Sequence, residues 1–434
     1  MNVRTSIHNR QQDRKQVNHE PIGSTQRRAA ATTLPTSVLV ALLGLVTGVQ
    51  MLATFAVLAL PTLATLAAPH FGFGAESIGY QISVIYSAAA ILSSFAGVHV
   101  RRHGAAAVSA CALAFSAGGL LGIASGSIAI AVLASASIGI AYGLTNPAAS
   151  HLLFRFAPRN RQNIVFALKQ TGVPLGGILA ALLLPRLAEA FNWQVAIGAG
   201  ATLMLLLVVP LLAVRPRLDD DRDPNARAGS AGMLSGLRVV FANPRLRALA
   251  IMGWAYASAQ FCLFTFLITM LVKDLGWSLV AAGEAATVMQ VGGVLGRLAW
   301  SMLADWIGRG IAILVAIGLG SAAFSLVMAM ATAAWPSWLL VIMVFGFGFC
   351  LVGWNGLWLA EVARAAGPGE VSLATGGVLA LTFFGIVLGP ATFATAYRVI
   401  GSYAHTYGVF SVLSVVGAAV LVHAMQGSRA PRPD

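Results

Sequence analysis

Apolar runs of about 20 residues recur twelve times along the 434-residue chain, and this recurrence limits the possible folds more than any other feature. A helix rises 1.5 Å per residue, so about 20 residues cross a hydrocarbon core of about 30 Å. The sequence therefore predicts an all-α polytopic membrane protein with twelve transmembrane helices. The predicted spans are 37–60, 78–99, 105–125, 128–150, 163–185, 192–214, 247–271, 281–304, 311–333, 337–360, 371–396 and 403–425.

Composition supports this fold class. Hydrophobic residues make up 58% of the chain and charged residues only 9%, whereas soluble domains carry about 25% charged residues. The net charge of +13 would suggest nucleic acid in a soluble domain. Here the basic residues gather in the short polar connections, where they set topology. We therefore expect membrane lipids and a small-molecule solute as partners, no nucleic acid, and a monomer.

The placement of Lys and Arg residues predicts the orientation. Of the 27, 22 fall in the tails and connections of one side, three fall on the other side, and two lie inside spans. The richer side is expected to be cytoplasmic, so both termini are cytoplasmic and the protein belongs in the bacterial inner membrane. The polar residues 1–36 are expected to be a retained tail, because the apolar run that follows is too long for a signal peptide.

The chain divides into two halves. The only long polar interruption between spans lies at 215–246 and is predicted to be a cytoplasmic linker between six-helix bundles at 37–214 and 247–425, with a short tail at 426–434. It contains three consecutive acids, Asp219 to Asp221, which we interpret as a solvated turn rather than a cation site. A weak internal repeat relates the two bundles. Gln50 matches Gln260, Asn146 matches Asn355, Arg155 matches Arg364, and Gly172 and Gly176 match Gly385 and Gly389.

A parallel repeat of this kind predicts a substrate site near the midplane, between the halves. Lys169 lies roughly 12 Å into the fifth predicted span, which is too deep for its charge to reach the interface easily. It shares a helix face with Gly172, Gly176 and Ala180, so it should face protein or a cavity. The glycine pairs at four-residue spacing predict close helix packing.

Three interpretations of Lys169 remain open. It can bind a ligand that brings the negative charge, it can be a structural lysine bonded to carbonyls or to Glu284, or it can be a neutral lysine involved in coupling. No acidic residue of the amino-terminal half lies at its depth. Glu284, about one turn into its span, is the leading candidate for proton coupling. The polar residues expected to line the site with Lys169 are Gln50, Tyr86, Asn146, Gln260, Gln290, Trp354 and Asn355.

Other chemistries find little support. The three cysteines have no pairing or metal-binding spacing, so neither a disulfide nor a metal is expected. The sequence contains no HExxH, GxSxG or Walker motif. We therefore expect no enzyme activity and no cofactor beyond possible proton coupling.

Two motifs carry a resemblance to a known family. GRLAWSMLADWIGRG, from Gly296 to Gly310, is similar to the pattern that follows the second helix of each half in the major facilitator superfamily. GVPLGG, at 172–177, resembles a motif of its drug-antiporter branches, and the longer KQTGVPLGG, at 169–177, resembles cyanate and other small-anion permeases. The resemblance covers all twelve spans. It implies two pseudo-symmetric six-helix bundles, with the first, fourth, seventh and tenth helices around a central cavity.

The resemblance also implies a gate, although the motifs depart from the family pattern. Ser301 stands where glycine is usual, Trp306 where a basic residue is usual, and Arg101 where the amino-terminal half should have an aspartate. An arginine cannot stabilise the positive end of a helix, so the gating role is carried over to Asp305 alone. Its expected partners are Arg309, Arg364 and the start of the eleventh span.

Together these features predict a secondary active transporter that moves a small, anionic organic solute by alternating access. The alternative is proton-coupled efflux of amphipathic compounds. A non-transporting membrane sensor on the same fold is a third possibility, and a passive channel is disfavoured because no ring of charge recurs around a pore.

Overall fold

The computed structural model describes residues 35–158, 161–226, 233–367 and 370–427, and these parts contain helices and no strand. Eleven helices are long and apolar enough to span a membrane, and the two parts of α4 together make a twelfth. The predicted all-α polytopic fold is therefore confirmed. The first half contains α2 (Thr36–Thr62), α3 (Ala64–Ala67), η1 (Ala68–Phe71), η2 (Ala75–Ser77), α4 (Ile78–His103), α5 (Ala105–Ala124), α6 (Ile128–Phe156), α7 (Gln162–Gln170), α8 (Gly172–Ala190) and α9 (Trp193–Leu218).

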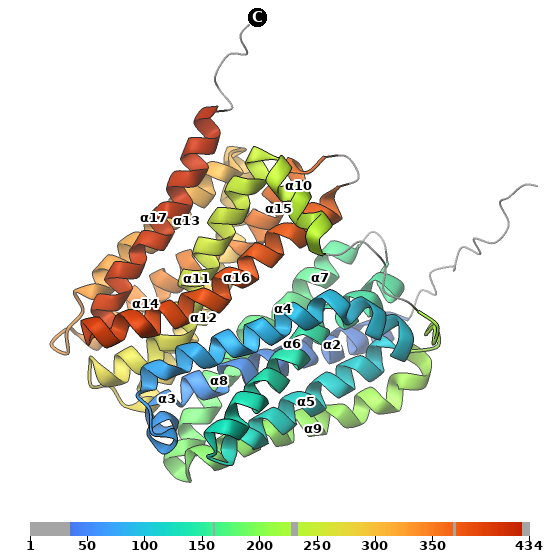
Figure 1. The fold of residues 1–434 in the computed structure, drawn as a ribbon, viewed down its shortest axis with the longest axis horizontal. Coiled ribbons are helices and arrows are strands. Elements are labelled where there is room, and N and C mark those ends of the chain that lie inside the picture. Colours follow the sequence, from blue (N-terminus) through green and yellow to red (C-terminus); the bar gives the residue numbers. More distant parts are fainter. Residues whose placement is uncertain (1–34, 159–160, 227–232, 368–369, 428–434) are drawn as a thin grey trace, which may run out of the picture.

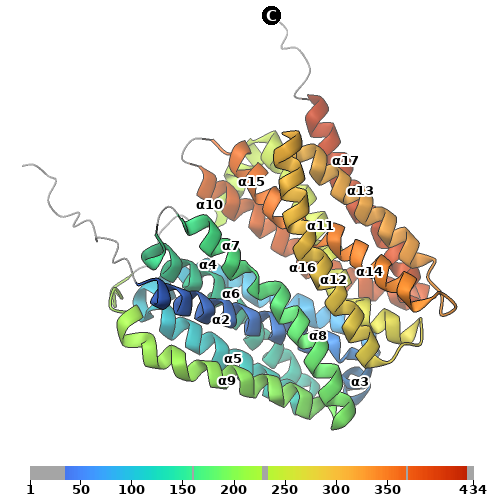
Figure 2. The same cartoon turned by 180° about the vertical axis from the view of Figure 1, so that it is seen from behind.

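The second half repeats this order after a short connecting helix. It contains α10 (Met233–Ala242), α11 (Pro244–Lys273), α12 (Leu279–Ile307), α13 (Gly310–Ala329), α14 (Ser337–Leu351), α15 (Asn355–Ala365), α16 (Val371–Ile400) and α17 (Tyr403–Gly427). Figures 1 and 2 show the halves as two bundles that lie side by side. We call the end that holds α10 and the end of α17 the linker end, and the opposite end, where α3 lies, the loop end.

Glycines set the closest helix contacts, as predicted from their spacing. Gly172 and Gly176 of α8 lie so close to α2 that an added Cβ would meet the Thr47 and Met51 carbonyl oxygens. In the second half, Gly385 and Gly389 of α16 press against α11 in the same way, at Trp254 and Ser258. The repeat in the sequence therefore corresponds to a repeat in packing. Gly44, by contrast, faces open space.

Two spans contain a short local irregularity in their helical hydrogen bonding. The fifth consists of α7 and α8, which meet at Thr171, and the tenth consists of α14 and α15, which are separated by residues 352–354. The backbone amides there stay bonded within the span: Thr171 N–H donates to the Leu168 carbonyl oxygen and Gly353 N–H to the Cys350 carbonyl oxygen, each three residues back. Both interruptions adjoin residues that the sequence predicted to line the site, Lys169 in the first case and Trp354 and Asn355 in the second.

The segment predicted as a linker is partly structured. Asp219, directly after α9, is only 5% exposed, and its carboxylate accepts hydrogen bonds from the Ala106 and Ala107 amides at 2.8 and 2.9 Å. The Asp220 and Asp221 carboxylates pair with Arg155. The interpretation of these acids as a solvated turn was therefore wrong for Asp219, which caps the start of α5. Further along, α10 packs on α16, where Gly236 lies against Gly377.

Polar contacts join the halves at the loop end, where α4 lies beside α16 and α8 beside α12 (Figures 1 and 2). Arg186 pairs with Glu284 at 2.6 Å, and the Tyr80 and Thr395 hydroxyls lie 3.0 Å apart. Arg398 lies 3.3 Å from the Ser77 hydroxyl and 3.6 Å from the Glu76 carboxylate. These bonds close the loop end in this conformation.

Candidate functional site

Lys169 is the centre of a buried polar cluster in the first half. Its side chain is only 2% exposed, and its ammonium donates to Gln50 Oε1 at 3.0 Å, to Gln170 Oε1 at 3.1 Å and to Asn146 Oδ1. The sequence predicted that Gln50 and Asn146 would converge on Lys169, and the structure brings them together. An ammonium has three donors, so all are occupied. The amide oxygens are neutral, however, and the positive charge stays uncompensated.

Local structure explains how the cluster forms. Lys169 lies in the last turn of α7, two residues before Thr171, where α7 meets α8. Gly172, three residues later, lets α2 approach closely enough for Gln50 to reach the ammonium. Asn146 lies one residue before Pro147 inside α6. Gln170 is itself exposed, so it is the member of the cluster that covers Lys169 from the outside.

The Gln50 side chain also carries an unsatisfied donor. It is 0% exposed, its oxygen is used by Lys169, and its Nε2 has no hydrogen-bond partner among the residues that the structure describes. A buried donor without an acceptor costs about 1–3 kcal/mol. The cluster therefore offers a cation and a nearby free N–H, a combination that suits an anionic oxygen.

A second cluster occupies the matching place in the other half. Gln260 of α11 accepts from Trp354 Nε1 at 2.9 Å and from Asn355 Nδ2 at 3.3 Å. Trp354 is fully buried, and Asn355 begins α15 at the interruption of the tenth span. The predicted residues Gln260, Trp354 and Asn355 thus form one group. It contains no charge of its own, so the pseudo-symmetry of the fold does not extend to the cation.

Aromatic rings line the space where the halves meet. The ring of Tyr86 lies 5.5 Å from Tyr142 of its own half and 4.7 and 6.1 Å from Phe261 and Phe383 of the other half, measured between ring centroids. Tyr86 was predicted to line the site. The other three rings were not predicted, because aromatic residues are ordinary in apolar spans and give no separate signal.

Arg297 of α12 is a functional candidate that the predicted site omitted. Its guanidinium is partly buried, its Nε donates to the Val352 carbonyl oxygen at 3.3 Å, and it lies within electrostatic range of the Tyr142 phenol. The signal was present in the sequence, since Arg297 and Lys169 are the two cations that fall inside predicted spans. Gln290, seven residues earlier on α12, is buried against Gly177 of α8.

The predicted gating and coupling residues lie apart from this site. Glu284 pairs with Arg186 at the loop end, where its side chain is 55% exposed. Asp305 and Arg309 are exposed at the linker end, and Asp305 forms no ion pair within the described part of the chain. Arg364 pairs with Glu361, and the described residues contain no ion pair between Arg364 and Asp305. Glu361 lies against Gly310, at the start of α13.

The sequence profile of the Major Facilitator Superfamily matches residues 41–390, which is most of the chain. The chain belongs to the Major Facilitator Superfamily. This assignment explains the two six-helix bundles and the position of the polar clusters at their shared interface. It places the protein in a family of multi-pass membrane transporters.

The relatives that the chain resembles carry different names, and the chain spans about half the length of the first of them. The chain is 28% identical over 234 residues to an uncharacterized MFS-type transporter of Mycobacterium tuberculosis, a match that spans 53% of this chain and 50% of that protein. It is 26% identical to a probable sugar efflux transporter of Mannheimia succiniciproducens, over 39% of this chain and 40% of that protein. It is also 26% identical to monocarboxylate transporter 13 of Bos taurus, over 65% of each chain.

Solved structures agree with the fold. The nucleoside transporter NupG matches with a TM-score of 0.73 at 19% identity, over 89% of this chain and 99% of that one. A peptide transporter POT in complex with sulfate matches with a TM-score of 0.70 at 15% identity, over 89% and 94%. At these identities the likeness concerns the fold alone.

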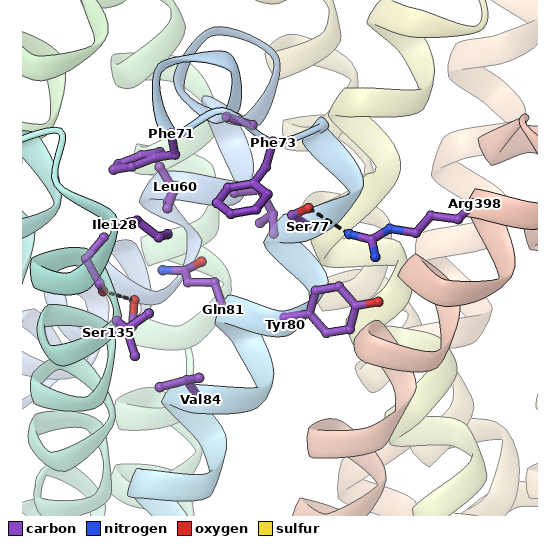
Figure 3. A pocket seen from close by; sticks show the side chains of 14 residues that line it. Leu60, Phe71, Phe73, Ser77, Tyr80, Gln81, Val84, Ile128, Ser135 and Arg398 are labelled. Carbon is purple, nitrogen blue, oxygen red and sulfur yellow. Dashed lines mark hydrogen bonds between the residues drawn. The ribbon is translucent and has the colours of Figure 1, made fainter.

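A separate cavity of about 330 Å³ lies at the loop end (Figure 3). Its walls are mostly apolar and come from α2, η1, α4 and α6, and Arg398 of α16 reaches its rim beside Ser77. Gln81 points into it, and neither polar atom of that side chain has a partner among the described residues. None of the residues that the sequence predicted for the substrate site lines this cavity. The cavity is therefore distinct from the central site.

Proposed function

We propose that this transporter moves a small anionic organic solute by alternating access, and that its linker end faces the cytoplasm. The observation that carries the proposal is the uncompensated Lys169 ammonium beside the free Gln50 Nε2. A fixed cation inside a membrane protein is expensive unless something offsets its charge. A solute that brings a carboxylate or a similar group offsets it while bound.

The positions of the acidic residues support this proposal. In the described part of the chain each acid lies at a helix end or in a connection, except Glu284, which lies in the second turn of α12. Glu284 pairs with Arg186 and not with Lys169. Among the described residues, no carboxylate is therefore available to act as a permanent counter-charge for Lys169.

Proton-coupled efflux of amphipathic compounds is the alternative. That function would usually need a carboxylate or histidine that changes protonation as access alternates. Glu284 was the leading candidate, and its exposed ion pair at the loop end places it far along α12 from the polar clusters. This arrangement favours a role in closing the loop end over a role in proton transfer. The aromatic rings around Tyr86 are the feature that would bind an amphipathic compound during efflux.

Thermal stabilisation of the purified protein tests the proposal. The probes are short carboxylates, each paired with the uncharged amide of the same carbon skeleton, for example propionate with propionamide. We expect the carboxylates to stabilise the wild type and the amides to do so only weakly. A charge-assisted hydrogen bond contributes about 1.5–3 kcal/mol, so Lys169→Ala should weaken carboxylate binding roughly 10- to 100-fold.

Two further variants keep this test decisive. Lys169→Met fills the space without a charge and should lose binding as Lys169→Ala does, whereas Lys273→Ala, at the exposed end of α11, should bind like the wild type. Equal stabilisation by acids and amides would contradict the proposal. So would carboxylate binding that survives in both Lys169 variants.

A further inference from the structure

Arg297 places a second uncompensated cation at the interface between the halves. Its Nε is bonded to the Val352 carbonyl oxygen, whereas its two terminal nitrogens have no hydrogen-bond partner among the described residues. A guanidinium presents these nitrogens as a planar pair that fits the two oxygens of a carboxylate or phosphate. Arg297 as a whole is partly buried.

The register of α8 and α12 puts Arg297 level with Lys169. Gly283 of α12 lies against the Ala181 carbonyl, and Gln290, seven residues later, lies against Gly177. The two helices therefore run antiparallel along their contact. Another seven residues along α12 leads about 10 Å further to Arg297. Eight residues back from Gly177, along α8 and then α7, leads about 12 Å to Lys169, because the two helices form one span. Both cations lie on the linker side of the Gln290 contact, at about the same depth.

The surroundings of the two cations approach one another across the interface. Asn146, which bonds to Lys169, lies one helical turn from Tyr142 on α6, and Tyr142 lies within electrostatic range of Arg297. On the far side, the Val352 carbonyl oxygen that accepts from Arg297 also lies 3.5 Å from Asn355 Nδ2. The first-half and second-half clusters are therefore parts of one polar region with a cation in each half.

We propose that the solute carries two anionic groups, one bound by Lys169 and Gln50 and the other by Arg297. The inference rests on the proposed function and narrows its substrate class to organic dianions such as dicarboxylates. Two like charges at about the same depth, one in each half, repel more strongly as the linker end closes and brings the halves together. A dianion between them replaces that repulsion with two attractions, one to each half, so it favours the closed conformation in a way that a monoanion does not.

Matched pairs of mono- and dicarboxylates test the inference on the purified full-length chain. The probes are malonate, succinate and glutarate, compared with propionate, butyrate and valerate, which have the same carbon numbers. We expect at least one dicarboxylate to stabilise the wild type at a concentration about tenfold or more below that of its monocarboxylate partner. Arg297→Gln should remove this preference and leave the two members of each pair equal.

A matched control is Arg217→Gln, which makes the same change at an exposed position at the end of α9 and should keep the preference for dicarboxylates. Arg297→Lys keeps the positive charge but not the planar pair of terminal nitrogens, so it should keep part of the preference for dicarboxylates. The dianion inference would be overturned if both members of every pair stabilised the wild type at equal concentrations. It would also be overturned if the preference for dicarboxylates persisted in Arg297→Gln. If monocarboxylates bind equally well and Lys169→Met abolishes their binding, the anion-transport proposal stands while this inference fails.

Discussion

At the scale of single residues, the Lys169 cluster shows how an amide can hold a cation without neutralising it. Gln50, Asn146 and Gln170 occupy every donor of the ammonium, yet each contributes only a dipole. A carboxylate at any of these positions would form a permanent ion pair. The choice of amides over acids is therefore what leaves the charge available to a solute.

Asn146→Asp tests this reasoning with an almost isosteric change. The new carboxylate would lie within bonding distance of the ammonium and act as a fixed counter-charge. We expect the affinity for the best-stabilising carboxylate to fall at least tenfold, with no loss of thermal stability in the absence of solute. Titration by thermal shift measures both quantities.

The control for this change is Asn192→Asp. Asn192 caps α9 at the loop end by accepting from the Val195 amide at 2.8 Å, and aspartate caps helices equally well. That variant should bind solute like the wild type. If Asn146→Asp also binds normally, Lys169 serves packing alone and the anion proposal loses its main support.

The sequence could predict Lys169 and several of its neighbours but not the whole site. A lysine inside an apolar span is conspicuous, and the internal repeat pointed to Gln260 and Asn355 as the match of Gln50 and Asn146. Arg297 was overlooked because it lies within about three turns of the end of its span, where arginines commonly reach the interface. Only the register of α8 and α12 shows that it is level with Lys169.

At the scale of helices, Asp219 provides the carboxylate that caps the start of α5. The connection between α4 and α5 has no acidic residue of its own. The family pattern expects an aspartate where this chain has Arg101, and a carboxylate from the end of α9 bonds instead to the first amides of α5. Gly104, with a φ of 94°, makes the turn and leaves room for that carboxylate, since an added Cβ would lie 2.1 Å from Asp219 Cγ. No spacing in the sequence reveals this pairing, because the two segments are more than 100 residues apart.

Replacing Asp219 should destabilise the first half. Asp219→Ala removes two buried hydrogen bonds and a negative charge from a helix start, which together cost about 1–2 kcal/mol of unfolding free energy. Asp219→Asn keeps a capping oxygen and should lose less. Unfolding in a graded series of denaturing detergent measures the difference.

Asp220→Ala is the matched control for the cap. Its carboxylate is 58% exposed and pairs with Arg155, and exposed ion pairs contribute about 0–1 kcal/mol. If Asp219→Ala and Asp220→Ala prove equally mild, the carboxylate of Asp219 is not a significant cap.

At the scale of the whole molecule, the repeat gives both halves the same packing but assigns them different electrostatic roles. Glycines bring α2 onto α8 and α11 onto α16 in equivalent ways. The sequence predicted this symmetry well, because small residues at four-residue spacing are a direct record of helix contact. The sequence could not predict which end of the interface between the halves is closed. The glycine contacts lie inside each half, and they stay the same whichever end is closed.

The ion pairs at the loop end should hold that end closed. Arg186 pairs with Glu284, and Arg398 bridges to Ser77 and Glu76 of the other half. Each exposed pair contributes about 0.2–1 kcal/mol, so the combined variant Arg186→Gln with Arg398→Gln should raise the open population roughly two- to thirtyfold. The rate at which a maleimide modifies a cysteine placed at Ser83 reports this opening.

Ser83 is a suitable reporter because its hydroxyl donates to the Val387 carbonyl oxygen across the interface. The side chain is partly buried there and becomes more accessible when α4 leaves α16. The measurement uses detergent-purified protein in which Cys111, Cys262 and Cys350 are replaced, so that the new thiol alone reacts. Arg217→Gln, at the other end of the molecule, should leave the rate unchanged. An unchanged rate in the double variant as well would mean that close packing, with Gly79 against the Pro390 carbonyl, keeps the loop end closed without help from the charges.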